Sequence, residues 1–250
     1  CSVVPVSDSS PPMGLRVGGV AQLRAPGYRW VSTGHPGGLR RADAAYNMQV
    51  PKGFSRTDLP AYIDTRLARA GFTTDGFALL TGVDMRHARL ARTAETTVIA
   101  TAGVSNPAVL PDPGAPVPVS SKPPRDGTVN ILISVDMHLT DAALFNLIAV
   151  AAEAKAATLL RMTDAPGTSS DAIVIGCAPG GAPVPFSGSV TPVGAAVRAC
   201  VRDAIAASLR SRYGQAGPPH GGDAAHGSTT SVRPRVAPLR LMDSPDGDGS

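Results

Sequence analysis

One part of the chain limits the possible folds more than any other: a long helical pattern between two short apolar runs. The runs, at residues 128–136 and 171–176, are rich in valine and isoleucine, which is typical of buried strands. Residues 140–159 show a helical pattern, and no charged residue lies between Asp141 and Glu153. Because so little charge faces water, most of this helix must be covered. The sequence therefore predicts an α/β domain in which helices lie in layers on a sheet.

The rest of the pattern adds strands and helices on both sides of this unit. We expect a mixed β-sheet covered by helices, in a single domain that spans residues 15–213. Residues 1–14 are expected to be frayed, and residues 214–250 have the polar composition of a disordered tail. Residues 106–127 hold seven prolines and are expected to form a loop. The further strands are expected at 15–23, 28–33, 76–84 and 96–104, and the further helices at 56–71 and 191–214.

Charge and composition argue against several classes of protein. The 23 basic and 19 acidic residues leave a net charge of +4, and the basic residues are scattered, so nucleic-acid binding is not expected. No uninterrupted apolar run of about 18 residues is present, so no membrane span is expected. The three cysteines are far apart and form no CxxC pair, which predicts reduced thiols and a cytoplasmic protein.

Small polar residues follow several expected strands, which is where ligands bind in open α/β sheets. The 96–104 strand has Thr101 near its end and is followed by Ser105 and Asn106. The largest cluster, Gly167–Asp171, instead precedes a strand and places three hydroxyls beside an acid. If that strand runs antiparallel to its neighbours, the cluster meets the other strand ends at one polar rim. The alternative is ordinary turn chemistry, because these residue types also favour turns.

Two charged residues in the 140–159 helix are unusual. Glu153 lies near the helix C-terminus, where the helix dipole disfavours a carboxylate by roughly 0.3–1 kcal/mol. Lys155 lies on the apolar stripe, and its simpler interpretation is a stem that keeps its ammonium group in water. Ser189 and Thr191 stand at the expected start of the last helix, where free N–H groups can bind an anion. An ordinary N-cap also explains them.

Standard catalytic signatures are absent from the sequence. It contains no HExxH, no GxGxxG, no phosphate-binding loop and no complete GxSxG pattern. No histidines and cysteines have the spacing of a metal site, so we expect activity without a metal. The residues by themselves predict a polar, hydroxyl-rich site with little charge, and they do not name its substrate.

Seven segments, in a fixed order across roughly residues 15–213, carry the most specific pattern, and they include TAGVSN, EAK and GTSSD. Together they resemble the adenosylcobinamide amidohydrolase family of corrinoid salvage. The resemblance implies hydrolysis of one amide, between the corrin ring's propionate and aminopropanol, in adenosylcobinamide or in a complete cobamide. A corrinoid presents many neutral carboxamides, which hydroxyl, amide and backbone groups can bind without burying charge. The segments are residues 30–51, 76–85, 96–107, 127–136, 139–159, 167–176 and 187–205.

The resemblance and the residue chemistry together give a candidate site. We expect Asp171 to activate water or a neighbouring hydroxyl, with Thr168 and Ser170 as the candidate hydroxyls. Lys155 is expected to polarise the carbonyl or to tune Asp171, and Glu153 is a further catalytic candidate. The adenosylated corrinoid is the substrate, and no cofactor is assigned. The residues expected to bind it are Gly37, Gly38, Asn47, Thr101, Ser105, Asn106, Ser189 and Thr191.

Two interpretations from other classes remain open at this point. One is a corrinoid-binding protein that performs no hydrolysis. The other is an unrelated small-molecule amide hydrolase whose motifs match by chance. The oligomeric state is not predicted.

Overall fold

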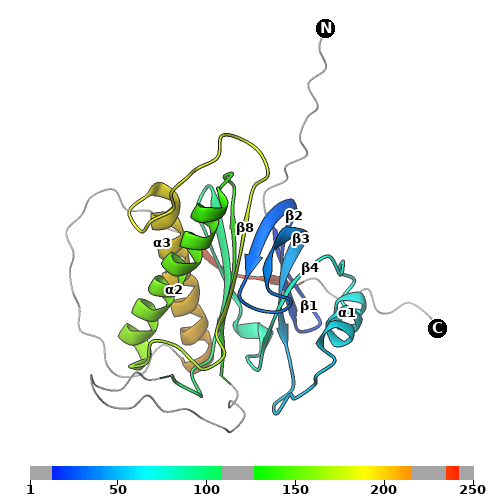
Figure 1. Cartoon of the computed structure of the whole chain (residues 1–250). Coiled ribbons are helices and arrows are strands. Elements are labelled where there is room, and N and C mark those ends of the chain that lie inside the picture. The colour runs from blue at the N-terminus through cyan, green and yellow to red at the C-terminus, as the bar shows by residue number, and fades with distance from the viewer. Residues whose placement is uncertain (1–12, 109–126, 215–234, 242–250) are drawn as a thin grey trace.

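The computed structural model describes residues 13–108, 127–214 and 235–241 (Figure 1). These residues form a ten-stranded mixed sheet with three α-helices, which confirms the predicted layered α/β fold. The strands are β1 Met13–Val17, β2 Val20–Ser32, β3 Gly38–Gln49, β4 Gly76–Thr81, β5 Arg89–Arg92, β6 Thr96–Ala102, β7 Val129–Val135, β8 Ala172–Cys177, β9 Arg235–Pro238 and β10 Arg240–Leu241. The helices are α1 Leu59–Arg69, α2 Asp141–Thr163 and α3 Pro192–Tyr213.

A parallel pair of strands, β7 and β8, lies at the centre of the sheet, and α2 connects the two. The order across the sheet is β10-β1-β2-β8-β7-β6-β5-β9, while β3 pairs with both β2 and β4. The first half of β2 pairs with β1 and the second half with β8, and the ladder with β3 is interrupted between Arg24 and Tyr28. Such an irregularity bends a strand, and β2 therefore links two parts of the sheet that pack face to face.

The sheet and the helices form four layers around three apolar cores. α2 and α3 cover one face of β6, β7 and β8, and β2, β3 and β4 pack onto the other face of these strands. α1 covers the outer side of β2, β3 and β4, and Figure 1 shows it on the far side of the molecule from α2 and α3. Buried examples are Ile133, Leu144 and Val197 in the first core, Trp30, Phe77 and Leu132 in the second, and Tyr46, Ile63 and Leu67 in the third.

Helix α2 carries little charge because much of it lies against the sheet. The Thr140 hydroxyl caps it by accepting a hydrogen bond from the Ala143 N–H at 3.2 Å, and Leu144 and Leu147 are fully buried. By length and composition α2 could nevertheless cross a membrane, since one 18-residue window has a mean hydropathy of 1.5. Of that window, 44% is buried inside the protein, which is less than the sequence predicts. One side of α2 packs on the sheet, and the other side is exposed in the described structure.

The N-terminal strands differ from the sequence prediction. Gly18 and Gly19 both have positive φ and form a tight turn, so β2 begins directly after it and continues to Ser32 instead of ending at residue 23. The sequence also does not predict β3 or β5. Both strands are rich in alanine and arginine, which are weak indicators of a strand, and tertiary packing decides their conformation.

Residues 235–241 differ from the prediction of a disordered tail over residues 214–250, because they form two short strands. β9 pairs antiparallel with β5, β10 pairs parallel with β1, and Leu239 between them is buried in the second core. Two exposed sheet edges offer unpaired backbone groups, and this short segment fills both. The tail as a whole is polar in composition, so its average gives no indication of its one apolar stretch. Residues 215–234 and 242–250 lie outside the described residues, as do residues 1–12 and 109–126.

Candidate active site

The Gly167–Asp171 cluster lies where strands of opposite direction meet. β8 is antiparallel to β2 but parallel to β7, and β6 is antiparallel to β7. The starts of β7 and β8 therefore share one edge of the sheet with the ends of β2 and β6. The predicted polar rim forms only in part, because residues 101–106 reach this edge whereas Asp136 and His138, which follow β7, lie at the opposite one.

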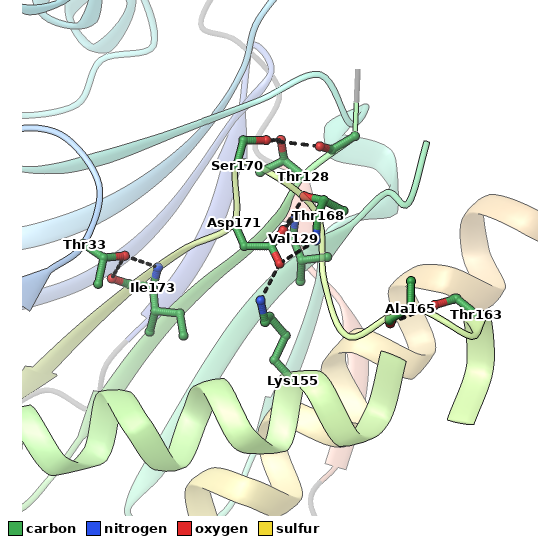
Figure 2. A network of polar contacts seen from close by, with 11 residues as sticks. Thr33, Thr128, Val129, Lys155, Thr163, Ala165, Thr168, Ser170, Asp171 and Ile173 are labelled. Atoms are coloured by element: carbon green, nitrogen blue, oxygen red, sulfur yellow. Dashed lines mark hydrogen bonds and ion pairs between the residues drawn. The ribbon is translucent and has the colours of Figure 1, made fainter. Parts of the chain in front are cut away.

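The Asp171 carboxylate accepts hydrogen bonds from four donors (Figure 2). Its Oδ1 accepts from the Val129 N–H at 2.8 Å and from the Thr168 hydroxyl at 2.5 Å. Its Oδ2 accepts from the Thr168 N–H at 3.0 Å and from the Lys155 ammonium group. Because Val129 begins β7 and Asp171 directly precedes β8, the parallel register brings them together. The cluster is thus tied to a neighbouring strand and a helix as well as to its own turn.

Lys155 reaches this carboxylate from α2. Its side chain is 14% exposed and that of Asp171 is 8% exposed, so the ion pair is largely withdrawn from water. The ammonium group is therefore paired rather than solvated, contrary to the simpler interpretation of Lys155. Gly167 leaves room for the pair, since a Cβ there would lie 2.6 Å from Asp171 Oδ2 and 2.9 Å from Lys155 Nζ.

The structure separates the two candidate hydroxyls, Thr168 and Ser170. Thr168 is buried, and its hydroxyl donates to Asp171. Ser170 is exposed, and its hydroxyl donates to the Gly127 carbonyl at 3.2 Å and lies 2.9 Å from the Thr128 hydroxyl. The sequence does not predict a role for Thr128. Its position two residues before the paired part of β7 matches that of Ser170 before β8, but only the strand register reveals this.

The chain that leaves β6 lies beside the cluster. The Asn106 side-chain amide donates to the Ser169 hydroxyl at 2.7 Å, and the Ala108 N–H donates to the Gly167 carbonyl at 2.9 Å. Ser105 is exposed in the same segment. Two of the predicted substrate-binding residues, Ser105 and Asn106, therefore lie next to the predicted catalytic ones.

Asn47 and Thr101 lie deeper in the protein, and both are fully buried. Asn47 Nδ2 donates to Thr101 Oγ1 at 2.7 Å, and Asn130 Nδ2 donates to Asn47 Oδ1 at 2.9 Å. This network connects β3 to β6 and β7 beneath the cluster. In this structure the two side chains hold strands in place, and their direct contact with a corrinoid stays a prediction.

Gly37 lies in the turn between β2 and β3, and Gly38 is the first residue of β3. Their φ values of 78° and 82° fall in the region that favours glycine. The segment just before them lies against the start of β8, where the Thr33 hydroxyl donates to the Ile173 carbonyl at 3.3 Å and accepts from its N–H at 3.0 Å. The turn therefore follows a segment that is fixed two residues from Asp171.

Glu153, Ser189 and Thr191 form a separate group. The Ser189 hydroxyl donates to Glu153 Oε2 at 3.2 Å on the exposed side of α2. Thr191 is the N-cap of α3 and accepts from the Gly194 N–H at 3.1 Å, as the simpler interpretation predicts. None of these hydrogen bonds reaches Asp171, so the predicted site residues divide into two groups on different sides of α2.

The described residues give no indication of a metal site or of a reactive thiol. Among them, no group of three or more His, Cys, Asp or Glu side chains is arranged to hold a metal ion. Cys177 and Cys200 are free and buried, and burial raises the pKa of the Cys200 thiol to about 12. This thiol is therefore protonated near neutral pH and is a poor nucleophile. The arrangement around Asp171 instead supports the chemistry of a hydroxyl next to a carboxylate.

The model of the adenosylcobinamide amidohydrolase family matches residues 19–217. The chain belongs to this family. An adenosylcobinamide amidohydrolase of Halobacterium salinarum is 54% identical over 222 residues, which cover 87% of this chain and 95% of that protein. An adenosylcobinamide amidohydrolase of Methanosarcina mazei is 31% identical over 192 residues, which cover 73% of this chain and 90% of that protein.

The match to the adenosylcobinamide amidohydrolase family includes every residue of the predicted site, whereas β9 and β10 lie beyond it. Among solved structures, a protein from Pyrococcus horikoshii OT3 aligns over 84% of this chain and 83% of its own, with 13% identity and a TM-score of 0.41. That likeness carries no argument about function. The family assignment rests on the sequence matches, and it confirms the resemblance seen in the seven segments.

Proposed function

We propose that this protein hydrolyses the amide between the corrin propionate and the aminopropanol of adenosylcobinamide. The products are adenosylcobyric acid and aminopropanol, and the reaction serves cobamide salvage. Family membership supports the proposal, as do two relatives named adenosylcobinamide amidohydrolase, one of them 54% identical. An enzyme is therefore favoured over a protein that only binds corrinoids.

One contact supports the assignment of the chemistry: the Thr168 hydroxyl donates to the Asp171 carboxylate. As Thr168 Oγ1 attacks the amide carbonyl carbon, its proton passes to Asp171 Oδ1 and a tetrahedral intermediate forms. The C–N bond then breaks, and the proton passes from Asp171 to the leaving amine. Water next attacks the ester on Thr168 while Asp171 accepts its proton. That proton returns to Thr168 Oγ1 as the acid is released.

Lys155 acts in this scheme as a positioning residue. Its ammonium group contacts Asp171 Oδ2, which leaves Oδ1 facing the Thr168 hydroxyl. Of the two roles predicted for Lys155, an action through Asp171 fits this contact better than polarisation of the carbonyl. The N–H groups of Val129 and Thr168 fix the same carboxylate, so the proton acceptor is oriented before substrate binds.

The groups around Thr168 suit a ligand with many neutral carboxamides. Ser105, Ser169 and Ser170 are exposed, and Asn106 holds Ser169. Hydroxyl and amide groups can donate to a carboxamide oxygen or accept from its nitrogen, and they bury no charge when they do so. The neutral polar rim therefore supports a corrinoid as the substrate.

The test is incubation of the full chain with adenosylcobinamide, followed by mass spectrometry for adenosylcobyric acid. Thr168→Val keeps the shape of the side chain and removes the hydroxyl, and we expect kcat to fall by about 10²–10⁴. Thr168→Ser keeps the hydroxyl and should retain most of the activity. Thr65→Val, on the far side of the molecule, is the matched control. Corrinoid binding, followed by visible absorbance, should be retained in all three variants.

The other outcomes identify the competing interpretations. Corrinoid binding without any product from the wild type would favour a binding protein, and absence of binding would favour an unrelated hydrolase. If Thr168→Val is active but Ser170→Ala is not, the nucleophile is Ser170. If both variants are active, Asp171 activates water directly.

A further inference from the structure

Much of the outer surface of α2 is apolar, although it faces away from the sheet and carries the exposed Glu153. Phe145 and Leu160 are 52% and 51% exposed, and Ala149 is exposed between them. Ala149 lies four residues after Phe145 and eleven before Leu160, a spacing that places all three on one side of a helix. An apolar helix surface of this length that remains open in the described structure indicates a binding partner.

The loop between β8 and α3 extends this surface. The Ser187 hydroxyl donates to the Ala143 carbonyl at 2.6 Å, so the loop lies along the first turns of α2. Two large apolar side chains of the loop, Phe186 and Val190, are 74% and 94% exposed. Both side chains project into solvent, where they can enter the boundary region of a lipid bilayer.

An arginine-rich groove lies beside the apolar surface, between α2 and α3, which are side by side in Figure 1. It has a volume of about 520 Å³, and alanine side chains line much of it. Four arginines and one acid line the groove, which gives a formal charge of 4 − 1 = +3, and the acid, Asp203, is paired with Arg202 at 2.6 Å. The arginines are Arg161, Arg198, Arg202 and Arg210.

We propose that these parts together, here named the helix face, bind a bilayer surface that contains anionic phospholipids. The arginines pair with lipid phosphates while Phe145, Phe186 and Val190 enter the boundary between headgroups and acyl chains. Charge complementarity favours this occupant over a second copy of the chain, because a two-fold contact would bring two arginine grooves together. The protein lies on the membrane and does not cross it, since the inner side of α2 packs against the sheet.

Membrane binding leaves the proposed catalytic site accessible. The Lys155 side chain extends from α2 towards Asp171 (Figure 2), whereas Phe145 and Leu160 lie on the outer side of the helix. The inference does not depend on hydrolysis. Each of the two proposals can fail without the other.

The experiment is co-sedimentation of the full chain with vesicles of phosphatidylcholine, alone or mixed with phosphatidylglycerol. We expect binding to the mixed vesicles at low salt, release at high salt, and little binding to phosphatidylcholine alone. Phe145→Ser with Phe186→Ser, and separately Arg161→Glu with Arg198→Glu, should each weaken binding by about tenfold or more. Leu39→Ser and Arg69→Glu, on β3 and α1, are the matched controls and should bind like the wild type.

Hydrolysis of adenosylcobinamide by the same variants reports on their folding, because none of the substituted residues belongs to the catalytic site. Equal sedimentation with both kinds of vesicle, or with neither, would overturn the proposal. So would helix-face variants that bind as well as the controls. Light scattering of the lipid-free protein completes the test: a dimer that Phe145→Ser dissociates would assign the face to a second copy of the chain.

Discussion

Hydrogen-bond donors surround Asp171, so a substitution there changes more than the proton acceptor. In Asp171→Asn the side-chain NH2 would face the Lys155 ammonium and the Thr168 N–H at one position, or the Val129 N–H at the other. The first orientation opposes two donors and the second opposes one, since the Thr168 hydroxyl can turn to accept. An ordinary Asx turn, in contrast, tolerates asparagine. A loss of rate in this variant therefore does not by itself distinguish a general base from a structural acceptor.

The interaction between Lys155 and Asp171 is better tested by measuring its coupling energy in a double-mutant cycle. Lys155→Met leaves Asp171 without its countercharge in a mostly buried position, and we expect the free energy of unfolding to fall by about 3–5 kcal/mol. Combining it with Asp171→Asn neutralises both groups, so the double variant should be about 0.5–3 kcal/mol more stable than the sum of the single losses predicts. Urea unfolding measures these values, with the exposed Lys52→Met as control. Strict additivity would show that Lys155 does not act through Asp171.

Gly167 should be intolerant of a side chain. A methyl group there would contact both Asp171 Oδ2 and Lys155 Nζ, and the carboxylate cannot move without losing its other donors. We expect Gly167→Ala to cost about 1–3 kcal/mol and to lower kcat. Gly180→Ala is the matched control, since nothing lies within 4 Å of its added Cβ. Equal activity and melting temperature in both variants would mean that the ion pair adjusts freely.

At the scale of elements, the sequence predicts what is local and apolar. It identifies β6, β7, β8, α2 and α3 because their apolar runs and caps are strong local signals, and it singles out the hydroxyl and acid cluster before β8. The partners of that cluster depend on other elements. The Val129 N–H reaches Asp171 through strand register, and Asn47 is buried because β3 packs over β7. Local composition predicts neither the strand register nor the bend of β2.

The start of α3 tests one predicted substrate contact. Thr191 is an N-cap in the structure, and Thr191→Ala should cost about 1 kcal/mol while Thr191→Ser should cost little. If capping is its whole role, KM for adenosylcobinamide stays unchanged in both variants. Thermal unfolding and steady-state kinetics check the two effects. A higher KM without a lower melting temperature would instead support Thr191 as a substrate-binding residue.

At the scale of the molecule, one continuous sheet serves all three cores. Its central strands position the candidate site, while its outer strands, β1 and β5, present edges that could pair with other chains. The C-terminal segment covers both edges, with β9 on β5 and β10 on β1. The segment therefore connects the two parts of the sheet, although its residues lie beyond the part of the chain that matches the family model.

Because of this arrangement, we expect the chain to lose stability when it is cut after Tyr213, although the composition of residues 214–250 is that of a disordered tail. Such a truncation removes β9, β10 and the buried Leu239, which packs beside Gly14 of β1. The loss of one buried leucine costs about 2–5 kcal/mol, so the melting temperature should fall by about 5–15 °C for a chain of this size. A chain cut after Leu241 keeps both strands and is the control. Newly exposed edges should also make the shorter chain aggregate at lower concentration, which light scattering would detect. If the two truncated chains have the same melting temperature, the C-terminal segment does not stabilise the sheet. The disordered tail then begins at residue 214, as its composition predicts.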